Sequence, residues 1–170
     1  MKAILDEIRL ACEQRLFYLA VMLCLALPDI CAALEDPKGE TNEKRYRAWA
    51  DKWLADQYGR FLPSQDMYRL RCGVLHQGRM GHPGLKYKRL AFSIGVGFLA
   101  DRNFLPSRRQ PEVLNLNAQI FCYNVCSSVR KWEQAQKNNP IVQVNLSRLV
   151  QYHPNGLSPY IDGIECLTSG

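Results

Sequence analysis

The longest apolar run of the chain, from Leu16 to Leu27, constrains the fold more than any other feature of the sequence. This run has twelve residues and lies between Arg15 and Pro28, whereas a helix that crosses a membrane needs about 20 apolar residues. Acidic residues precede the run, at the place where a secretory signal would be basic. We therefore expect a core helix, a cytoplasmic protein and no association with a membrane.

Length, charge and cysteine content indicate the number of domains, the kind of partner and the state of the thiols. The 170 residues fit a single domain, 1–170, which is large enough to bury a core without disulfides or metals. A net charge of +6 and a pI near 9.0 favour a polyanionic partner. The seven cysteines contain no CxxC pair and mostly fall in apolar stretches, which indicates buried, reduced thiols.

Hydrophobic spacing predicts helices in the first part of the chain. Apolar residues recur every three or four positions over residues 2–27, which predicts a long first helix. Pro28 is expected to end or kink this helix, with a short helix restarting there. Thr41 is the expected N-cap of the next helix, which ends at Gly59.

The second half of the chain changes its pattern. Residues 90–98 alternate between large apolar side chains and small ones, which predicts a strand. A single strand leaves its backbone unpaired, so we expect a β-hairpin partner near 102–105 or 112–116. Helical spacing resumes from about residue 114 to 137 and again over 141–152.

The sequence as a whole predicts a mainly α-helical fold. We expect a bundle of about five helices with a small β-hairpin insertion, followed by an irregular tail over about residues 152–170.

The candidate site lies on a helix predicted from Ser64 to Gly78, which carries Arg71 and, five residues later, His76. A guanidinium is permanently charged and fits a phosphate, and an imidazole transfers protons near neutral pH. Five positions along a helix separate two side chains by about 140°, so their convergence requires the long arginine stem or a second subunit. The pair predicts binding or cleavage of RNA without a metal.

The segment YRLRCGVLHQG, which follows a Trp-rich helix and precedes a basic turn, resembles the motif helix of the HEPN superfamily of small helical bundles. LPDICAALE, YRAW, the predicted strand and a helix ending near RKW extend the resemblance to an uncharacterised bacterial HEPN-like family over about residues 15–150. The resemblance implies a homodimer in which two Arg–His motifs face one cleft. It also implies a metal-independent endoribonuclease, of a toxin or antiphage-defence type, with RNA and an antitoxin or other protein as partners. Only Arg71 and His76 carry over as catalytic residues.

One departure from the HEPN pattern favours an alternative function. Active members usually have a polar residue after the arginine, where this chain has Cys72. The alternative is a non-catalytic protein-interaction or nucleotide-binding helical module. In such a module the arginine forms a salt bridge to Asp66 or Glu35, and the histidine interacts with the last carbonyls of its helix. Gly73, in mid-helix, is expected to admit another helix across a dimer interface.

Further side chains near the motif are predicted to contact a nucleic-acid backbone, because basic clusters with interleaved aromatic residues track phosphates. A solvated charged face is the alternative interpretation. The predicted nucleic-acid-binding residues are Arg69, Gln77, Arg79, Lys86, Lys88 and Arg89.

Two further pairs are not predicted to be sites. Arg148 and His153 repeat the spacing of the motif, but His153 precedes a proline in an apparent loop. Asp29 and Glu35 lie six positions apart, and nothing in the sequence places them opposite a glycosidic bond or a metal.

No metal or cofactor is predicted either. Cys122 and Cys126 lie one helical turn apart, but structural zinc needs four converging ligands. Trp49, Trp53 and Trp132 have the spacing of core residues rather than of a ligand cage. The sequence also lacks a phosphate-binding glycine loop of the nucleotide-binding folds.

Overall fold

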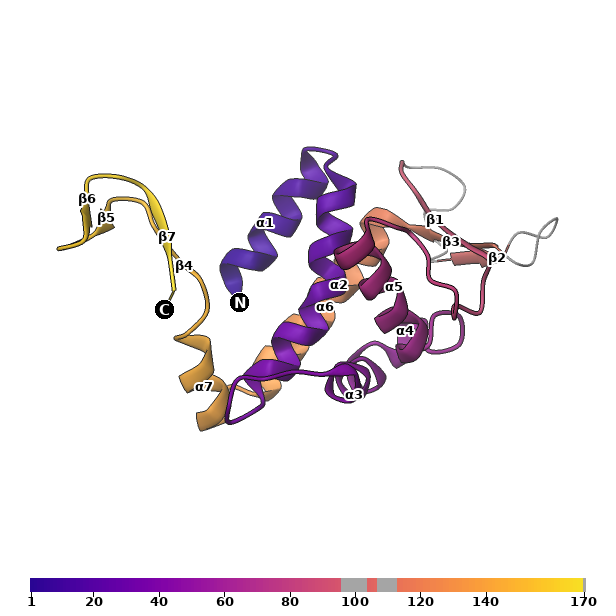
Figure 1. The fold of residues 1–170 in the computed structure, drawn as a ribbon, viewed down its shortest axis with the longest axis horizontal. Coiled ribbons are helices and arrows are strands. Elements are labelled where there is room, and N and C mark those ends of the chain that lie inside the picture. The colour runs from indigo at the N-terminus through magenta and orange to yellow at the C-terminus, as the bar shows by residue number, and fades with distance from the viewer. Residues whose placement is uncertain (96–103, 107–112, 170) are drawn as a thin grey trace.

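A computed structural model shows a body of packed helices with a small sheet at one end and a β ribbon at the other (Figure 1). The structure describes residues 1–95, 104–106 and 113–169. Within these ranges most of the ordered backbone is helical. The predicted mainly α-helical class is therefore confirmed.

The predicted first helix is two helices. Helix α1 (Lys2–Glu13) and helix α2 (Phe17–Leu34) meet at a tight turn in which Arg15 has a φ of 59°. A positive φ is costly for a residue with a side chain, and it ends the regular helix. Pro28 lies inside α2, so the prediction that it ends the helix is wrong. Its penalty of about 3 kcal/mol in an isolated helix is offset by burial, since Leu27 and Cys31 beside it are fully buried.

Three helices follow in the next segment: α3 (Glu43–Trp53), the single turn α4 (Ala55–Tyr58) and α5 (Ser64–Gln77). The N-cap of α3 is Asn42 rather than Thr41, because the Asn42 side chain accepts a hydrogen bond from the Arg45 backbone N–H at 3.0 Å. Pro63 precedes α5, and Ser64 is its first residue rather than its cap. Gly78 ends α5 in the left-handed conformation, as predicted.

The small sheet differs from the predicted hairpin. Its strands are β1 (Arg89–Ser93), β2 (Phe104–Pro106) and β3 (Val113–Asn117), in the order β1-β3-β2. The partner of β1 falls where it was expected, but β1 and β3 are parallel, and the antiparallel pair is β2 with β3. The predicted end of the first strand, residues 96–98, lies outside the described residues.

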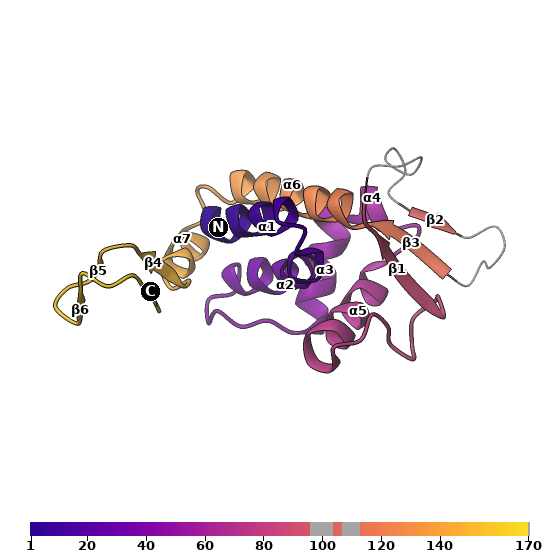
Figure 2. The ribbon, with the colours of Figure 1, turned by 90° about the horizontal axis from the view of Figure 1, so that it is seen from above.

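The last helices are α6 (Ala118–Ala135) and α7 (Pro140–Leu146). Helix α6 begins later than predicted, because residues 113–117 pair as β3 and the Asn117 side chain then caps the helix by accepting from the Ile120 N–H at 3.0 Å. Helix α7 ends before residue 152, and the predicted irregular tail is wrong. That tail forms an antiparallel ribbon that extends away from the helices (Figures 1 and 2). Its strands are β4 (Gln151–His153), β5 (Gly156–Leu157), β6 (Ile161–Asp162) and β7 (Cys166–Thr168).

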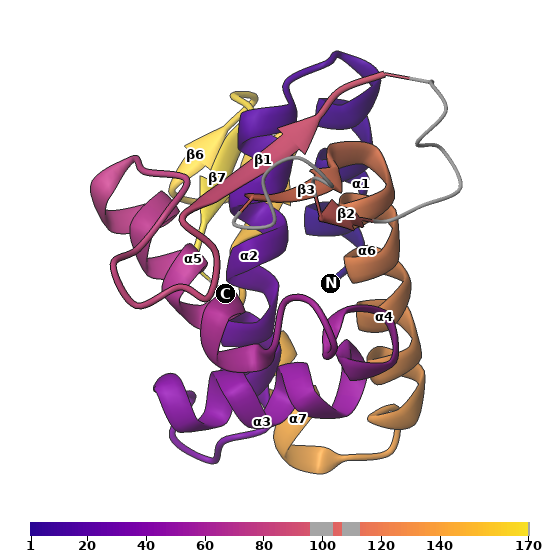
Figure 3. The same ribbon diagram turned by 90° about the vertical axis from the view of Figure 1, so that its right-hand side faces the viewer.

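Helix α2 is the centre of the body. It packs against α1, α3, α5 and α6, and Figure 3 shows α5 on one side of it and α6 on the other. Its length and composition would also suit a membrane span, but 61% of its apolar window is buried inside the protein. This is the placement expected of a core helix, and it positions one polar residue of α2 beside α5.

Candidate functional site

The predicted pair meets within one chain. Arg71 lies in the middle of α5 and His76 in its last turn, and Arg71 Nη1 lies 2.9 Å from His76 Nε2. The two positions are about 7.5 Å apart along a helix axis. The long arginine side chain spans this distance, so no second subunit is needed to bring the two groups together.

The contact between Arg71 and His76 sets the hydrogen-bonding role of each group. A guanidinium carries only N–H donors, so Nε2 of His76 is the acceptor. The His76 side chain is exposed to solvent. An accessible imidazole whose Nε2 faces a cation has the geometry to accept a proton.

Asp29 of α2 holds the opposite edge of the guanidinium. Arg71 Nε lies 2.6 Å from Asp29 Oδ2, and Asp29 as a whole is only 8% exposed. Thr41 is a further neighbour of this carboxylate and acts to lower its pKa. This ion pair joins α2 to α5 and orients the guanidinium so that its Nη1 faces His76.

Burial and charge act in opposite directions at this ion pair. Burial raises the pKa of Asp29 above its usual value, and the positive charge of Arg71 offsets only part of that shift. Burial alone would lower the pKa of Arg71, but the negative charge of Asp29 and the contacts with Cys72 and Asp29 together outweigh it, and the pKa lies above its usual value. The guanidinium is therefore always charged, and the ionised form of Asp29 depends on it.

Two other side chains of α5 border the guanidinium. The Arg71 guanidinium carbon lies 5.7 Å from the ring centroid of Tyr68, close enough for a cation–π interaction. Arg71 Nη1 also points to Cys72 Sγ at 3.9 Å. Cys72 thus supplies only a weak acceptor to the guanidinium.

Asp29 is the member of the site that sequence reasoning missed. The predicted structural partners of Arg71 were Asp66 and Glu35, and both are wrong. Asp66 pairs with Arg69 at 3.4 Å, and Glu35 accepts a hydrogen bond from Trp132 Nε1 at 2.6 Å. The presence of a carboxylate within an apolar helix could have indicated that Asp29 pairs with a cation, because a buried charge requires a partner.

Arg69 fastens the loop that follows α5. Its guanidinium donates to the backbone oxygen of Gly84 and pairs with Asp66. Asp66 in turn accepts a hydrogen bond from the backbone N–H of Lys86 at 3.3 Å. The loop therefore folds back along α5, and RNA would compete with these partners for Arg69.

Gly73 lets this same loop pack closely against α5. A Cβ atom at Gly73 would lie 2.3 Å from the Gly81 backbone oxygen and 2.9 Å from that of Arg79. The prediction that Gly73 admits another helix is therefore wrong, because the loop of the same chain occupies the space.

The other predicted nucleic-acid-binding residues surround the end of α5. All are exposed, and they lie in its last turn, in the loop and at the first position of β1. Lys86 lies over the Tyr87 ring, 5.5 Å from its centroid, so the basic and aromatic side chains are interleaved as predicted. Binding of nucleic acid by this surface stays a prediction; its members are Gln77, Arg79, Lys86, Lys88 and Arg89.

The second Arg–His pair of the sequence does not meet. Arg148 Nη1 donates to Asn145 Oδ1 at 3.2 Å, and His153 Nε2 lies 3.1 Å from Thr168 Oγ1 in the ribbon. Equal spacing in the sequence therefore gives two different outcomes, because only the first pair lies on one helix.

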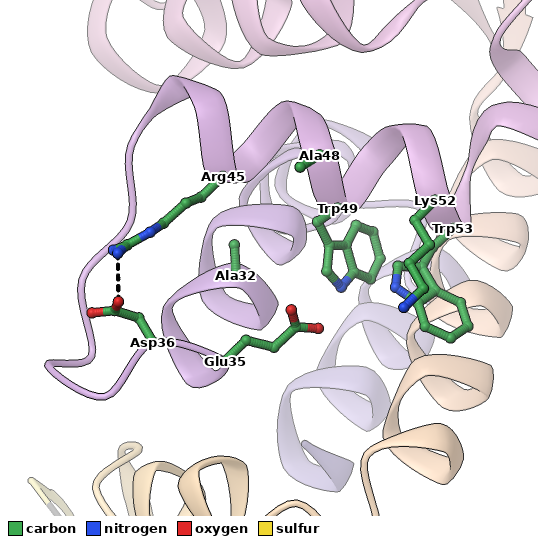
Figure 4. Close-up of a pocket in the computed structure, with 8 residues that line it drawn as sticks. All are labelled: Ala32, Glu35, Asp36, Arg45, Ala48, Trp49, Lys52 and Trp53. Atoms are coloured by element: carbon green, nitrogen blue, oxygen red, sulfur yellow. Dashed lines mark ion pairs between the residues drawn. The ribbon is translucent and has the colours of Figure 1, made fainter.

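A cavity of about 400 Å³ between α2 and α3 lies apart from Arg71 and His76 (Figure 4). Its charged side chains already have partners in this region. Asp36 pairs with Arg45 at 2.5 Å, and Lys52 lies over the Trp53 ring at 5.1 Å. Trp49 and Trp132 are buried core residues, as predicted, and Trp53 is partly buried against the core. The indole N–H groups of Trp49 and Trp53, which line the cavity, have no hydrogen-bond partner among the described residues.

Fold and site together define a mainly helical domain with a solvent-facing Arg–His pair backed by a buried carboxylate. Comparison of the chain with protein-family models, with curated proteins and with solved structures gives no match. Among the residues that the structure describes, no group of three or more His, Cys, Asp or Glu side chains is placed to hold a metal ion.

Proposed function

We propose that this protein is a HEPN-like, RNA-binding domain that cleaves RNA without a metal through Arg71 and His76. The observation that supports the proposal is the contact of 2.9 Å between Arg71 Nη1 and His76 Nε2, with Asp29 on the far edge of the guanidinium. The proposal includes a cytoplasmic homodimer, a role as a toxin or in antiphage defence, and RNA and an antitoxin as partners.

The geometry supports different roles for the two side chains: Arg71 binds the phosphate and His76 transfers the proton. A phosphodiester that binds Arg71 Nη1 replaces His76 as the partner of that N–H, because one N–H donates to one strong acceptor. Nε2 of His76 is then released beside the bound phosphate.

The released imidazole accepts the proton of the ribose 2′-hydroxyl, whose oxygen attacks the adjacent phosphorus. Arg71 stabilises the charge that builds on the phosphoryl oxygens. The bond from phosphorus to the 5′-oxygen breaks, and the leaving oxygen takes a proton from water. Asp29 keeps the guanidinium in place and does not touch the substrate.

The second candidate function is a non-catalytic module that binds a nucleotide or another protein. One observation favours it: Arg71 already has partners on both edges, Asp29 and His76, and its neighbour Cys72 is only a weak acceptor. In this alternative the pair stabilises the end of α5.

Incubation of the protein with a mixed RNA pool in excess EDTA separates the two functions. The enzyme predicts cleavage in EDTA that is lost in His76→Ala and in Arg71→Ala at equal concentration of folded protein. The matched controls are Arg148→Ala and His153→Ala, which change the pair of equal spacing that does not meet, and they should cleave like the parent.

Two results would reject the enzyme. The first is a parent protein that binds RNA and does not cleave it, which supports the module instead. The second is cleavage that does not follow the proposed site: either EDTA abolishes it, or both His76→Ala and Arg71→Ala retain it. A contaminating nuclease would give these results.

A further inference from the structure

Four of the seven cysteines form a cluster between three helices, far from the Arg–His pair in the sequence. Cys12 comes from α1, Cys24 from α2, and Cys122 and Cys126 from α6. Cys24 Sγ donates to the backbone oxygen of Cys122 at 3.9 Å, one helical turn before Cys126, and Cys12, Cys122 and Cys126 line one groove. All four are free thiols, so the cluster gathers reduced cysteines from three helices.

A groove leads from the surface to this cluster. It has a volume of about 330 Å³, lies between α1 and α6, and has an apolar wall that includes Leu5 and Ile8. Cys12, Cys122 and Cys126 line it. Cys24 does not line the groove and is 1% exposed, so it lies deeper in the core than the three cysteines that line the groove. A small reagent in the groove therefore meets Cys126 before Cys24.

The charges around the groove favour a thiolate at Cys126. The hydrogen bond from Cys24 lowers the pKa of Cys126, burial opposes that shift, and the positive charge of Arg130 adds to it. Burial raises the pKa of Cys12 to about 12, and it raises the pKa of Cys24 well above its usual value. Arg9 pairs with Glu13 at 3.0 Å, and Arg130 is the cation whose charge acts on Cys126. The titratable groups that face the cluster, among the described residues, are Arg9, Cys12, Glu13, Cys24, Tyr58, Cys122, Tyr123 and Arg130.

We propose that Cys126 is a site of oxidation by peroxides and that Cys24 resolves the product as a disulfide between α2 and α6. Redox-sensitive thiols share these features: thiolate character, a path to solvent and a second thiol within reach. The proposal does not depend on the ribonuclease proposal, because neither cysteine contacts Arg71 or His76.

The chemistry is balanced with a hydroperoxide as the oxidant. The Cys126 thiolate attacks one peroxide oxygen, the O–O bond breaks, and the products are a sulfenic acid and an alkoxide or hydroxide that takes up a proton. The Cys24 sulfur then displaces the sulfenic oxygen, which leaves as water with the Cys24 proton. Two thiols and one peroxide thus give one disulfide, one water and one alcohol or second water.

Treatment of the full chain with one equivalent of hydrogen peroxide tests the proposal by mass spectrometry. The expected product has a mass lower by two hydrogen atoms and a peptide that links Cys24 to Cys126. Cys24→Ala should instead leave a sulfenic acid at Cys126 that dimedone traps. Cys31→Ala and Cys166→Ala are the controls, one buried and one partly exposed outside the cluster, and both should form the disulfide.

A surface variant keeps the test valid if a cysteine variant fails to fold. Arg130→Gln removes the cation at the groove, and Lys131→Gln is its matched control, since both side chains are exposed neighbours on α6. Arg130→Gln should slow oxidation of Cys126 by about two- to tenfold at pH 7 and shift its pH profile to higher pH, because less thiolate is present. Lys131→Gln should react like the parent.

Three outcomes would overturn the proposal: first oxidation at Cys72 or Cys166, a folded protein that forms no link between Cys24 and Cys126, or equal rates in Arg130→Gln and Lys131→Gln.

Discussion

At the scale of single residues, Asp29 explains why the arginine of α5 is placed for chemistry. It is a buried carboxylate in the apolar core helix, and its counter-charge is Arg71 at 2.6 Å. An isolated buried carboxylate would be protonated, since burial raises its pKa. The ion pair therefore has two roles: it keeps Asp29 ionised, and it fixes the guanidinium toward His76.

Removal of the guanidinium should destabilise the protein in a pH-dependent way. Arg71→Gln leaves Asp29 without its counter-charge and should lower the free energy of unfolding by about 2–4 kcal/mol at pH 7. Without Arg71 the pKa of Asp29 rises further in the folded state. A raised carboxyl pKa gives stability that is present below the unfolded value of about 3.9 and is lost as pH rises through the folded value. The loss should therefore be smaller at pH 4 than at pH 7.

Urea denaturation of the parent and the variant at both pH values measures this difference. The double variant Asp29→Asn with Arg71→Gln has no carboxyl to ionise at this position, so its stability relative to the parent should not show the same added loss toward neutral pH. An equal loss for Arg71→Gln at pH 4 and pH 7 would mean that Asp29 is not held by this charge.

At the scale of elements, the loop after α5 has a defined place because of one glycine. The backbone oxygens of Arg79 and Gly81 pass over Gly73, where a side chain would collide with them. Arg69 then fastens the loop at Gly84. Helix and loop thus form one unit, and the basic residues beyond Gly78 depend on it for their position.

Gly73→Ala should reveal this packing. Alanine is favoured over glycine by about 1 kcal/mol in a helix, but the added Cβ lies 2.3 Å from the Gly81 oxygen, so the loop has to move. We expect a net loss of about 1–3 kcal/mol, measured as the free energy of unfolding in urea. Gly81→Ala is the control, since nothing lies within 4 Å of a Cβ there. A stabilised Gly73→Ala variant would show that the loop does not rest on the helix.

Asn145 joins α7 to the end of α2. Its amide nitrogen donates to the backbone oxygens of Leu34 at 3.1 Å and Asp36 at 2.7 Å, and its side chain is buried. Asn145→Ala leaves both oxygens without this donor and should cost about 1–3 kcal/mol. The neighbouring Gln143→Ala is exposed and should change the free energy of unfolding by less than about 0.5 kcal/mol. If the two variants lowered the free energy of unfolding equally, the hydrogen bonds of Asn145 would not be what joins α7 to α2.

Elements with strong local signals were predictable from the sequence, and those set by distant contacts were not. The end of α5 follows from Gly78, because a left-handed residue is coded locally. The continuity of α2 through Pro28 does not, because surrounding helices stabilise it. The direction of β3 relative to β1 and the pairing of the ribbon strands likewise depend on contacts between separate segments, which a local sequence pattern does not show. In the site, Arg71 and His76 share one helix and were found, whereas Asp29 comes from another helix and was missed.

For the molecule as a whole, the position of the Arg–His pair determines what a second subunit would contribute to the site. The sequence alone left a second subunit as one way to bring the pair together, but both side chains of the pair belong to one chain. Each protomer of the proposed homodimer would therefore hold its own complete pair. A partner could enlarge the RNA surface at the exposed end of α5 without supplying a missing member.

Mixing experiments test whether one protomer is sufficient for cleavage. Arg71→Ala and His76→Ala are denatured together, refolded to exchange subunits, and assayed on RNA in EDTA at a constant total concentration. Because Arg71 and His76 meet within a chain, no protomer of this mixture holds a complete pair, and the mixture should be as inactive as either variant alone. A site composed of the arginine of one subunit and the histidine of the other would instead be restored in the mixed dimers, in which one of the two sites is complete. Such a recovery of cleavage would show that the contact of 2.9 Å between Arg71 and His76 is a resting arrangement, and that the acting pair forms between copies.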